Sequence, residues 1–374
     1  MTNDEHPAAA VASLPRLIAW EVTRSCPLAC RHCRAAARPA PYPGELTTDE
    51  GRRLLDNIAS FARPTMILTG GEPMLRPDIY DLAAHAHGLG LPVVMAPCGL
   101  LIDDASAARM VKAGIRVISI SLDGATAASH DAFRGVRGAF DGALEGLEAA
   151  KRAGLGFQIN TTVTRHNLAE LPAILDLAVR LGAGVFNPFL LVPTGRGKDL
   201  KDQEISPQAY ERTLNWLADQ EGRTDIRIRV TCAPHYERIL REHARAASQA
   251  PGVNAGPSSP ARDVLPAPTP VGGASPKGCL GGKAFAFISH VGKVQICGFL
   301  EVECGDLRSA GLDFRKVWET SEVFLRMRDV DGYHGKCGRC EYRRVCGGCR
   351  ARAFAMTDDA LGEEPFCIYQ PRAK

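Results

Sequence analysis

The most informative stretch of the chain is Glu21-Val-Thr-Arg-Ser-Cys26-Pro-Leu-Ala-Cys30-Arg-His-Cys33, with three cysteines at the spacing Cys-x3-Cys-x2-Cys. It follows the apolar run Leu17-Ile-Ala-Trp20, which predicts a buried strand. Three thiolates this close can converge on one centre, and a four-iron cluster normally takes four thiolates. Three would leave one iron open to the amino group and carboxylate of a small molecule. A structural zinc site is the alternative, but zinc requires four closed ligands and usually a local Cys-x2-Cys pair.

Composition narrows the class of protein. The chain has 374 residues, 45% of them hydrophobic and 23% charged, which predicts a folded protein of about two domains. A net charge of +3 gives no support for nucleic-acid binding. No apolar run approaches the roughly 20 residues of a membrane span, and the polar, Ala-rich start does not resemble a secretion signal. We therefore expect a cytoplasmic protein, in which 13 cysteines indicate metal or redox chemistry rather than disulfides.

Beyond the triplet, short apolar strands alternate with helices. The capping box Thr47-Thr-Asp-Glu50 predicts the start of the first helix. Strands are expected at 17–20, 65–68, 93–96, 117–122, 157–163, 185–192 and 226–230, and further helices near 78–89, 104–113, 139–153, 168–181 and 207–219. Repeated units of this kind form a parallel sheet covered by helices. Six core units predict a partial (β/α)6 barrel of the TIM type, with its site at the carboxyl ends of the strands.

Four segments are expected along the chain. Residues 1–15 are predicted to be a disordered tail and residues 16–243 the partial barrel. Residues 244–277 are rich in Pro, Gly, Ser and Ala and predict a linker or long loop. Residues 278–374 form a cysteine-rich second domain.

Several side chains at strand ends are candidates for binding or catalysis. Gly70-Gly71-Glu72-Pro73 offers free backbone amides and a carboxylate that suit an ammonium group, although such a sequence is also an ordinary turn. Cys98 ends the third strand, where a small buried residue is favoured over a thiol facing the cavity. Arg196 ends the sixth strand and suits a substrate carboxylate. His235 and Tyr236 follow the last strand close to Cys232, although a histidine in a polar loop at a helix start is the plainer interpretation of His235.

The C-terminal segment carries a second cysteine array. Cys279 and Cys297 flank an expected hairpin that turns at 289–292. A run with spacings x2, x5 and x2 follows, and then one further cysteine: Cys337, Cys340, Cys346, Cys349 and Cys367. A zinc module is the alternative for the four-cysteine run alone.

The triplet, with Gly-Gly-Glu-Pro about 35 residues after it, resembles the radical S-adenosylmethionine (SAM) superfamily. This resemblance implies a [4Fe-4S] cluster on Cys26, Cys30 and Cys33. It also implies that Gly70, Gly71, Glu72 and Pro73 hold the methionyl amine of SAM. Ser121, Asp123 and Arg134 match the segment that meets the ribose and carboxylate of SAM, a surface salt bridge being the alternative for Arg134.

The C-terminal cysteines resemble the SPASM extension of this superfamily, which implies one or two auxiliary iron–sulfur clusters. One would be held by Cys337, Cys340, Cys346 and Cys367. The other would take Cys279, Cys297 and Cys349, with Cys304 or Cys232 as a possible fourth ligand.

Strings such as Leu191-Val-Pro-Thr-Gly-Arg-Gly197 and Cys232-Ala-Pro-His-Tyr236 resemble the radical SAM enzymes of an alternative haem-biosynthesis branch. The resemblance implies oxidative decarboxylation of two propionates of iron-coproporphyrin III to vinyls, giving haem b. It implies a ferredoxin-type or flavodoxin-type electron donor. Because the substrate radical must lose one electron, our hypothesis is that a C-terminal cluster accepts it. Arg196 would bind a propionate, and His235 or Tyr236 would approach the macrocycle iron.

Three other functions stay open. A didecarboxysiroheme deacetylase or a related tetrapyrrole enzyme shares these motifs. A peptide-modifying SPASM maturase shares both cysteine regions, but the roughly 15 polar residues before the first strand contain no expected peptide-binding element. A non-catalytic metal-binding protein would not need the triplet together with Gly-Gly-Glu-Pro.

Overall fold

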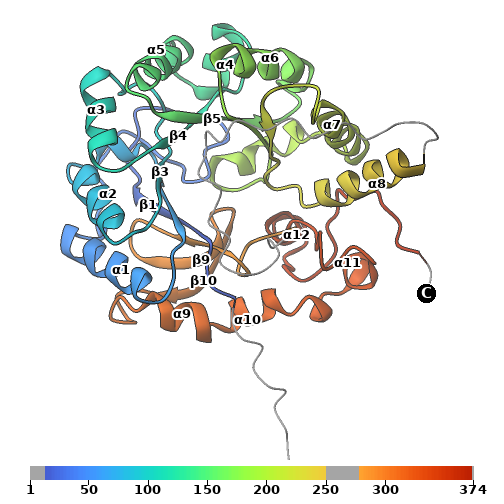
Figure 1. The fold of residues 1–374 in the computed structure, drawn as a ribbon. Coiled ribbons are helices and arrows are strands. Elements are labelled where there is room, and N and C mark those ends of the chain that lie inside the picture. Colours follow the sequence, from blue (N-terminus) through green and yellow to red (C-terminus); the bar gives the residue numbers. More distant parts are fainter. Residues whose placement is uncertain (1–12, 250–277, 373–374) are drawn as a thin grey trace, which may run out of the picture.

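The computed structural model describes residues 13–249 and 278–372 and has one curved ten-stranded sheet at its centre (Figure 1). Seven parallel strands follow one another in chain order: β1 (Leu17–Thr23), β2 (Thr65–Gly70), β3 (Val93–Met95), β4 (Val117–Ser121), β5 (Gly156–Val163), β6 (Val185–Leu190) and β7 (Arg227–Ile228). The helices between them are α1 (Thr48–Phe61), α2 (Ile79–Gly88), α3 (Asp104–Lys112), α4 (Ala127–Arg134), α5 (Ala139–Arg152), α6 (Leu171–Leu181) and α7 (Pro207–Gln220). They lie along the outer side of the sheet, as the predicted partial barrel requires.

The predicted strands and helices of the barrel are confirmed to within a few residues, apart from α4, which was not predicted, and β7, which is shorter than expected. Helix α1 begins after Thr47, whose hydroxyl accepts a bond from the Glu50 amide while the Glu50 carboxylate accepts one from the Thr47 amide. This reciprocal cap satisfies two amides that the first turn leaves without helical partners. Short 3-10 turns complete the barrel: η1 (Pro73–Leu75), η2 (Leu168–Glu170) and η3 (Gly195–Gln203).

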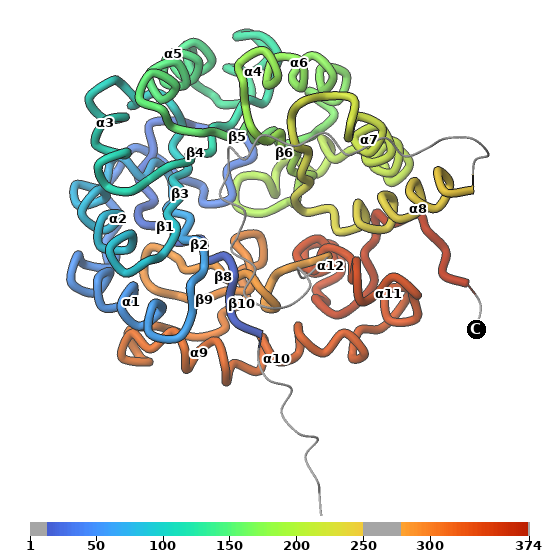
Figure 2. The backbone as a smooth tube through the Cα atoms, in the orientation of Figure 1, coloured from blue at the N-terminus to red at the C-terminus, as the bar shows by residue number. Residues whose placement is uncertain are grey.

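The cysteine-rich segment continues the barrel sheet instead of forming a sheet of its own. Strand β8 (Phe285–Ile288) pairs in parallel with β1, in the register Leu17 to Phe285. The predicted hairpin then turns the chain into β9 (Lys293–Cys297), and β10 (Leu300–Asp306) forms the edge. Figure 2 shows these strands beside β1 although they lie far from it in sequence. The sheet therefore continues across the domain boundary expected at residue 278, because β8 pairs with the edge of β1 that β2 leaves open.

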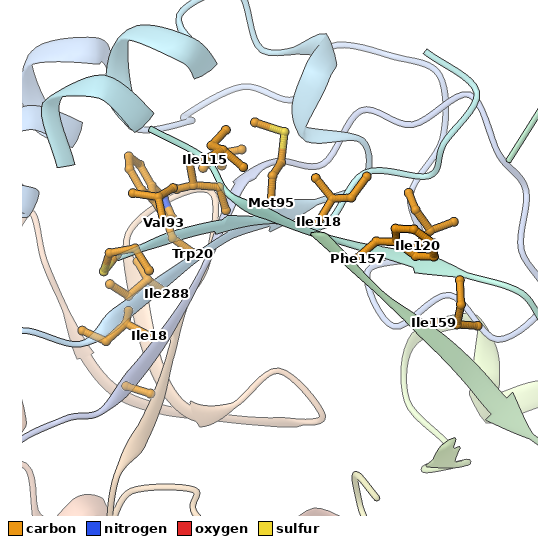
Figure 3. Packing of buried hydrophobic residues seen from close by; sticks show 14 of the residues in the cluster. Ile18, Trp20, Val93, Met95, Ile115, Ile118, Ile120, Phe157, Ile159 and Ile288 are labelled. Carbon is orange, nitrogen blue, oxygen red and sulfur yellow. The ribbon is translucent and has the colours of Figure 1, made fainter. Parts of the chain in front are cut away.

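The core packs between the sheet and its helices (Figure 3). Trp20 and Ile18 of β1, Met95 of β3 and Ile288 of β8 have no solvent exposure and join one continuous cluster. Burial of each such side chain contributes roughly 1.5–3 kcal/mol. Helix α1 approaches closely because Gly51 faces Trp20, where a Cβ would lie 2.7 Å from the indole.

The remaining helical elements follow β7 in the sequence: α8 (Tyr236–Gln249), α9 (Phe314–Thr320), α10 (Glu322–Arg328), the 3-10 turn η4 (Val330–Gly332), α11 (Gly335–Arg339) and α12 (Arg350–Thr357). The predicted linker was wrong at its start, because residues 244–249 belong to α8; residues 250–277 lie outside the described part. Of the expected tail, residues 1–12 also lie outside it, whereas the carbonyl of Ser13 accepts a bond from Trp318 Nε1 at 2.9 Å. No helix of residues 13–249 and 278–372 combines the length and apolar character of a bilayer-crossing segment.

Candidate active site

A cavity of about 240 Å³ opens where the parallel strands end. The three triplet cysteines line one wall, together with Gly70 and Gly71 after β2, Ser121 at the end of β4 and Arg134 of α4. The structure thus brings Cys26, Cys30 and Cys33 to the place where a barrel of this type binds its ligands.

The cysteine loop is held by backbone bonds to α4 and within itself. The amides of Ala29 and Arg31 donate to the carbonyls of Arg134 and Phe133, at 3.2 and 3.0 Å. Cys26 and Cys30 are buried, and burial raises the pKa of the Cys26 thiol to about 12. Thiols of this kind ionise when a metal binds them. Cys33 is partly exposed, and all three thiols line the cavity. A fourth cysteine of this lining, Cys98, hydrogen-bonds through its thiol to Glu72. The triplet therefore fits an iron–sulfur cluster with one open iron.

Arg196 holds the cysteine loop through hydrogen bonds to its backbone and does not line the cavity. Its Nε and Nη1 donate to the carbonyls of Cys30 and Ala37 at 2.8 and 2.5 Å, and its amide donates to the carbonyl of Cys33 at 3.0 Å. The expectation that Arg196 binds a substrate carboxylate is therefore corrected, because two of its three guanidinium nitrogens already hold the cluster loop.

Gly70 and Gly71 line the cavity, but a side chain at either position would clash with the protein's own backbone and not with a ligand. A Cβ on Gly70 would lie 2.2 Å from the carbonyl oxygen of Thr23, and one on Gly71 would lie 2.4 Å from that of Arg24. The glycines let the chain after β1 pass directly over the end of β2, and this passage places the cysteine loop.

Glu72 is completely buried and does not reach the cavity surface. Its two carboxylate oxygens accept the amides of Met74 and Cys98, at 2.9 and 2.6 Å, and burial raises its pKa. Pro73, also buried, opens the turn η1. Glu72 thus ties the ends of β2 and β3 together, and of the four residues of this motif only Gly70 and Gly71 line the cavity.

Cys98 lies on the cavity wall, so the favoured interpretation of a small buried residue was wrong. Its thiol is only partly covered, and burial, then the neighbouring Glu72, raises its pKa. The protonated thiol donates to the Glu72 carboxylate, which also accepts the Cys98 amide.

Asp123 and Arg134 form a buried ion pair between β4 and the cysteine loop. Asp123 Oδ2 lies 2.7 Å from Arg134 Nη2, and Asp123 Oδ1 accepts the amide of Thr162 at 2.6 Å. Burial raises the pKa of Asp123, but Arg134, the nearby His32 and His130 and the Thr162 amide together outweigh burial, and the net shift is downward. Arg134 Nη1 lies 3.6 Å from Cys30 Sγ, so its positive charge faces the triplet. Ser121 lines the cavity beside this pair, whereas Asp123 lies behind it.

The cavity lining also contains residues that the motif analysis missed. Phe189 of β6 and Phe299, between β9 and β10, have ring centroids 6.3 Å apart and both line the cavity. Arg34 also lines it, stacked 4.4 Å over Phe287 and paired with Glu21 at 3.3 Å. Only the position of Arg34 directly after Cys33 could have pointed to it; nothing local marks Phe299 as a cavity residue.

The C-terminal cysteines form two groups. Four line a small pocket between α8 and α11: Cys337, Cys340, Cys346 and Cys367. In the other, the thiol of Cys232 donates to Cys349, which raises the pKa of Cys232 and lowers that of Cys349, and the charges of Cys279 and Cys349 act on Cys297. Cys304 lies apart, with its sulfur on the Val302 carbonyl at 3.8 Å. The structure therefore brings Cys232, and not Cys304, to Cys279, Cys297 and Cys349.

These donor sets do not converge as ligands of a single ion would. Within the described part of the chain, no three Cys, His, Asp or Glu side chains are arranged around one ion site.

Arg352 joins the second cysteine group to the cavity wall. It is fully buried, and its Nη2 donates to the carbonyls of the cavity residues Leu190 and Leu191 at 3.0 and 2.7 Å. Its Nη1 donates to the Cys232 carbonyl at 2.9 Å and pairs with Glu364 at 3.4 Å.

His235 and Tyr236 do not line the cavity, which corrects their expected approach to a macrocycle there. The buried ring of His235 lines the pocket of Cys337, Cys340, Cys346 and Cys367. Tyr236 donates through its hydroxyl to Glu221 Oε1 at 2.9 Å and begins α8.

Comparison with known proteins agrees with this geometry. The model of the radical SAM superfamily matches residues 20–178. AdoMet-dependent heme synthase of Nitratidesulfovibrio vulgaris is 50% identical over 357 residues, covering 96% of this chain and 93% of that protein. AdoMet-dependent heme synthase of Methanosarcina barkeri is 45% identical over 365 residues, covering 98% and 99%. Streptococcus suis SuiB bound to S-adenosylmethionine shares the fold, with a TM-score of 0.71 at 15% identity over 96% of this chain and 78% of that one.

These relatives, the fold and the cysteine-lined cavity identify the chain as an enzyme of the radical SAM superfamily that uses a [4Fe-4S] cluster and SAM, and it belongs to the family of AdoMet-dependent haem synthases.

Proposed function

We propose that this enzyme converts two propionates of iron-coproporphyrin III into vinyl groups, giving haem b. Each propionate loses one hydrogen atom from its β-carbon, then carbon dioxide and one electron, and the remaining two carbons become the vinyl. The identities of 45–50% to AdoMet-dependent haem synthases over nearly the whole chain carry the proposal. When bound, the N-terminal cluster supplies the electron that cleaves SAM, and an auxiliary cluster supplies a site for the electron that decarboxylation releases.

The cavity walls divide the binding of the two reactants. Gly70, Gly71, Ser121 and Arg134 lie on the side of the triplet and suit the polar groups of SAM. Phe189 and Phe299, which also line the cavity, offer apolar faces that suit a flat macrocycle.

Arg34 takes over the role expected of Arg196, that of binding a propionate. Glu21 lies 3.2 Å from Arg24 and 3.3 Å from Arg34, so one carboxylate faces two guanidinium groups. Burial raises the pKa of Glu21, but Arg34 and its other partners hold it at about 2, which keeps the carboxylate ionised. The three groups together carry one net positive charge, which a propionate at the cavity wall would neutralise.

The two C-terminal cysteine groups are proposed to hold two auxiliary clusters, one on Cys337, Cys340, Cys346 and Cys367 and one on Cys232, Cys279, Cys297 and Cys349. The contacts of Arg352 with Leu190, Leu191 and Cys232 support an electron outlet from the cavity to the second group. A ferredoxin-type or flavodoxin-type donor in the cytoplasm would supply the low-potential electrons.

The test uses anaerobically reconstituted enzyme with SAM, a low-potential reductant and iron-coproporphyrin III, followed by mass spectrometry. Two successive losses of carbon dioxide with hydrogen, alongside 5′-deoxyadenosine, are the expected result. Deoxyadenosine without these losses would refute the proposed substrate, and turnover of didecarboxysiroheme instead would identify the deacetylase reaction.

A further inference from the structure

His235 is a buried polar side chain whose bonding is incomplete. Its relative exposure is 1%, and neither ring nitrogen has a hydrogen-bond partner among the described residues. A buried polar group left unpaired is destabilising, so an arrangement of this kind calls for a partner outside the protein chain.

The ring of His235 faces a specific site. It lines the pocket that Cys337, Cys340, Cys346 and Cys367 share, and the ring of Tyr210 meets it edge-on at 5.2 Å from the other side. His235 stands between β7 and α8, so a residue of the barrel reaches the cysteines of the C-terminal segment.

Other polar groups of this pocket already have partners. Glu364 accepts the amides of Phe366 and Cys349 on its two oxygens, each at 3.1 Å. Tyr342 accepts from Arg245 Nη1 at 3.2 Å, and Tyr369 donates to Glu341 at 2.5 Å. Backbone amides donate to the sulfur atoms of Cys337, Cys340 and Cys346, each at 3.4 Å. The sulfur atoms of a cluster accept several such bonds, so they remain the acceptors for an imidazole N–H.

We propose that His235 donates a hydrogen bond to a sulfur of the auxiliary cluster on Cys337, Cys340, Cys346 and Cys367, and thereby raises the reduction potential of that cluster. Four cysteines complete the ligation of a four-iron cluster, so the imidazole is a donor and not a ligand. A hydrogen bond to a cluster sulfur stabilises the reduced, more negative state. His235 is thus a positioning and tuning residue outside the SAM cavity. This inference rests on the proposed auxiliary cluster at these four cysteines.

The test is a redox titration of the reconstituted enzyme, followed by electron paramagnetic resonance, in full-length protein whose triplet is replaced by alanine to remove the N-terminal cluster. A Cys340→Ala variant identifies the signal of the cluster in question by its disappearance. His235→Phe keeps the ring without a donor, and His235→Gln keeps an N–H donor. The matched control is His243→Phe on α8, whose half-buried ring bonds to Asn215 at 2.8 Å, away from the cysteines.

We expect His235→Phe to shift the reduction equilibrium of this cluster about tenfold toward the oxidised state, which is about 59 mV for one electron. His235→Gln should recover most of the shift, and His243→Phe should show none. Loss of the cluster in His235→Phe with retention in His235→Gln would also support the N–H bond.

An unchanged potential in His235→Phe with full iron content overturns the inference and leaves the proposed cluster intact. Loss of the cluster from both His235 variants likewise overturns it, since the ring would then be needed only for structure. If the enzyme with native His235 shows no signal that depends on Cys340, the proposed cluster and the inference both fail.

Discussion

Replacement of Arg352 by methionine should destabilise the enzyme strongly. The guanidinium is fully buried and donates to three backbone carbonyls and the Tyr210 hydroxyl, besides pairing with Glu364. Methionine fills similar space but removes the donor to the Leu190 and Leu191 carbonyls and leaves the Glu364 carboxylate without its cation, whereas the Cys232 carbonyl keeps the bond from the Tyr210 hydroxyl. Breaking a buried ion pair from one side costs about 3–5 kcal/mol, and we expect a loss of that order.

The assay is the urea midpoint of the reconstituted enzyme under anaerobic conditions, measured by fluorescence and by loss of the cluster absorbance. The matched control is Arg315→Met, which removes an exposed pair with Glu319 and should cost at most about 1 kcal/mol. Arg352→Met with Glu364→Gln should recover part of the loss, since the second change removes the uncompensated charge. A midpoint for Arg352→Met equal to that of Arg315→Met would refute the assignment of Arg352 as a buried clamp between barrel and cysteine site.

Three further predictions concern the cysteine sites and a buried carboxyl. Arg196→Ala should lower the iron occupancy of the triplet more than Arg196→Lys, since lysine can still reach one carbonyl of the cysteine loop. Equal iron content in the unaltered enzyme and both variants would contradict a role of Arg196 in holding this loop. Cys232→Ala should remove about four irons per chain and Cys304→Ala none, as measured by metal analysis; the reverse order would reassign the fourth ligand. Burial raises the pKa of Glu204 to about 7, above its ordinary 4.5. Between pH 4.5 and 7 the folded enzyme therefore binds more protons than the unfolded chain, and its free energy of unfolding falls as the pH rises through this range. Glu204→Gln should therefore stabilise by about 1–3 kcal/mol at pH 8 and less at pH 6 in urea unfolding, and a gain independent of pH would show that ionisation is not the cause.

Local sequence patterns predicted the barrel well because its elements are defined over short distances. The Thr47–Glu50 capping box, the strand before the triplet and the hairpin at 289–292 each depend on neighbours in sequence. The candidate ligands of the auxiliary clusters came from the resemblance of the C-terminal cysteines to the SPASM extension, which left Cys232 and Cys304 as alternatives.

Contacts between distant segments were not predictable in this way. Arg196 is separated from Cys30 by 166 positions, and the bond between them is formed only by the closure of the barrel. The pairing of β8 with β1 and the reach of His235 into the cysteine pocket have the same origin. Gly70 shows a subtler failure, since its position was predicted, but the steric partner is the Thr23 carbonyl and not a ligand.

The most direct test of the proposed reaction follows deuterium. Iron-coproporphyrin III carrying deuterium at the β-carbons of its propionates is incubated with the reconstituted enzyme, SAM and reductant, and 5′-deoxyadenosine is analysed by mass spectrometry. We predict one deuterium in each deoxyadenosine and a vinyl product that has lost one deuterium at each converted propionate. Deoxyadenosine without deuterium, formed while the propionates stay intact, would contradict the account.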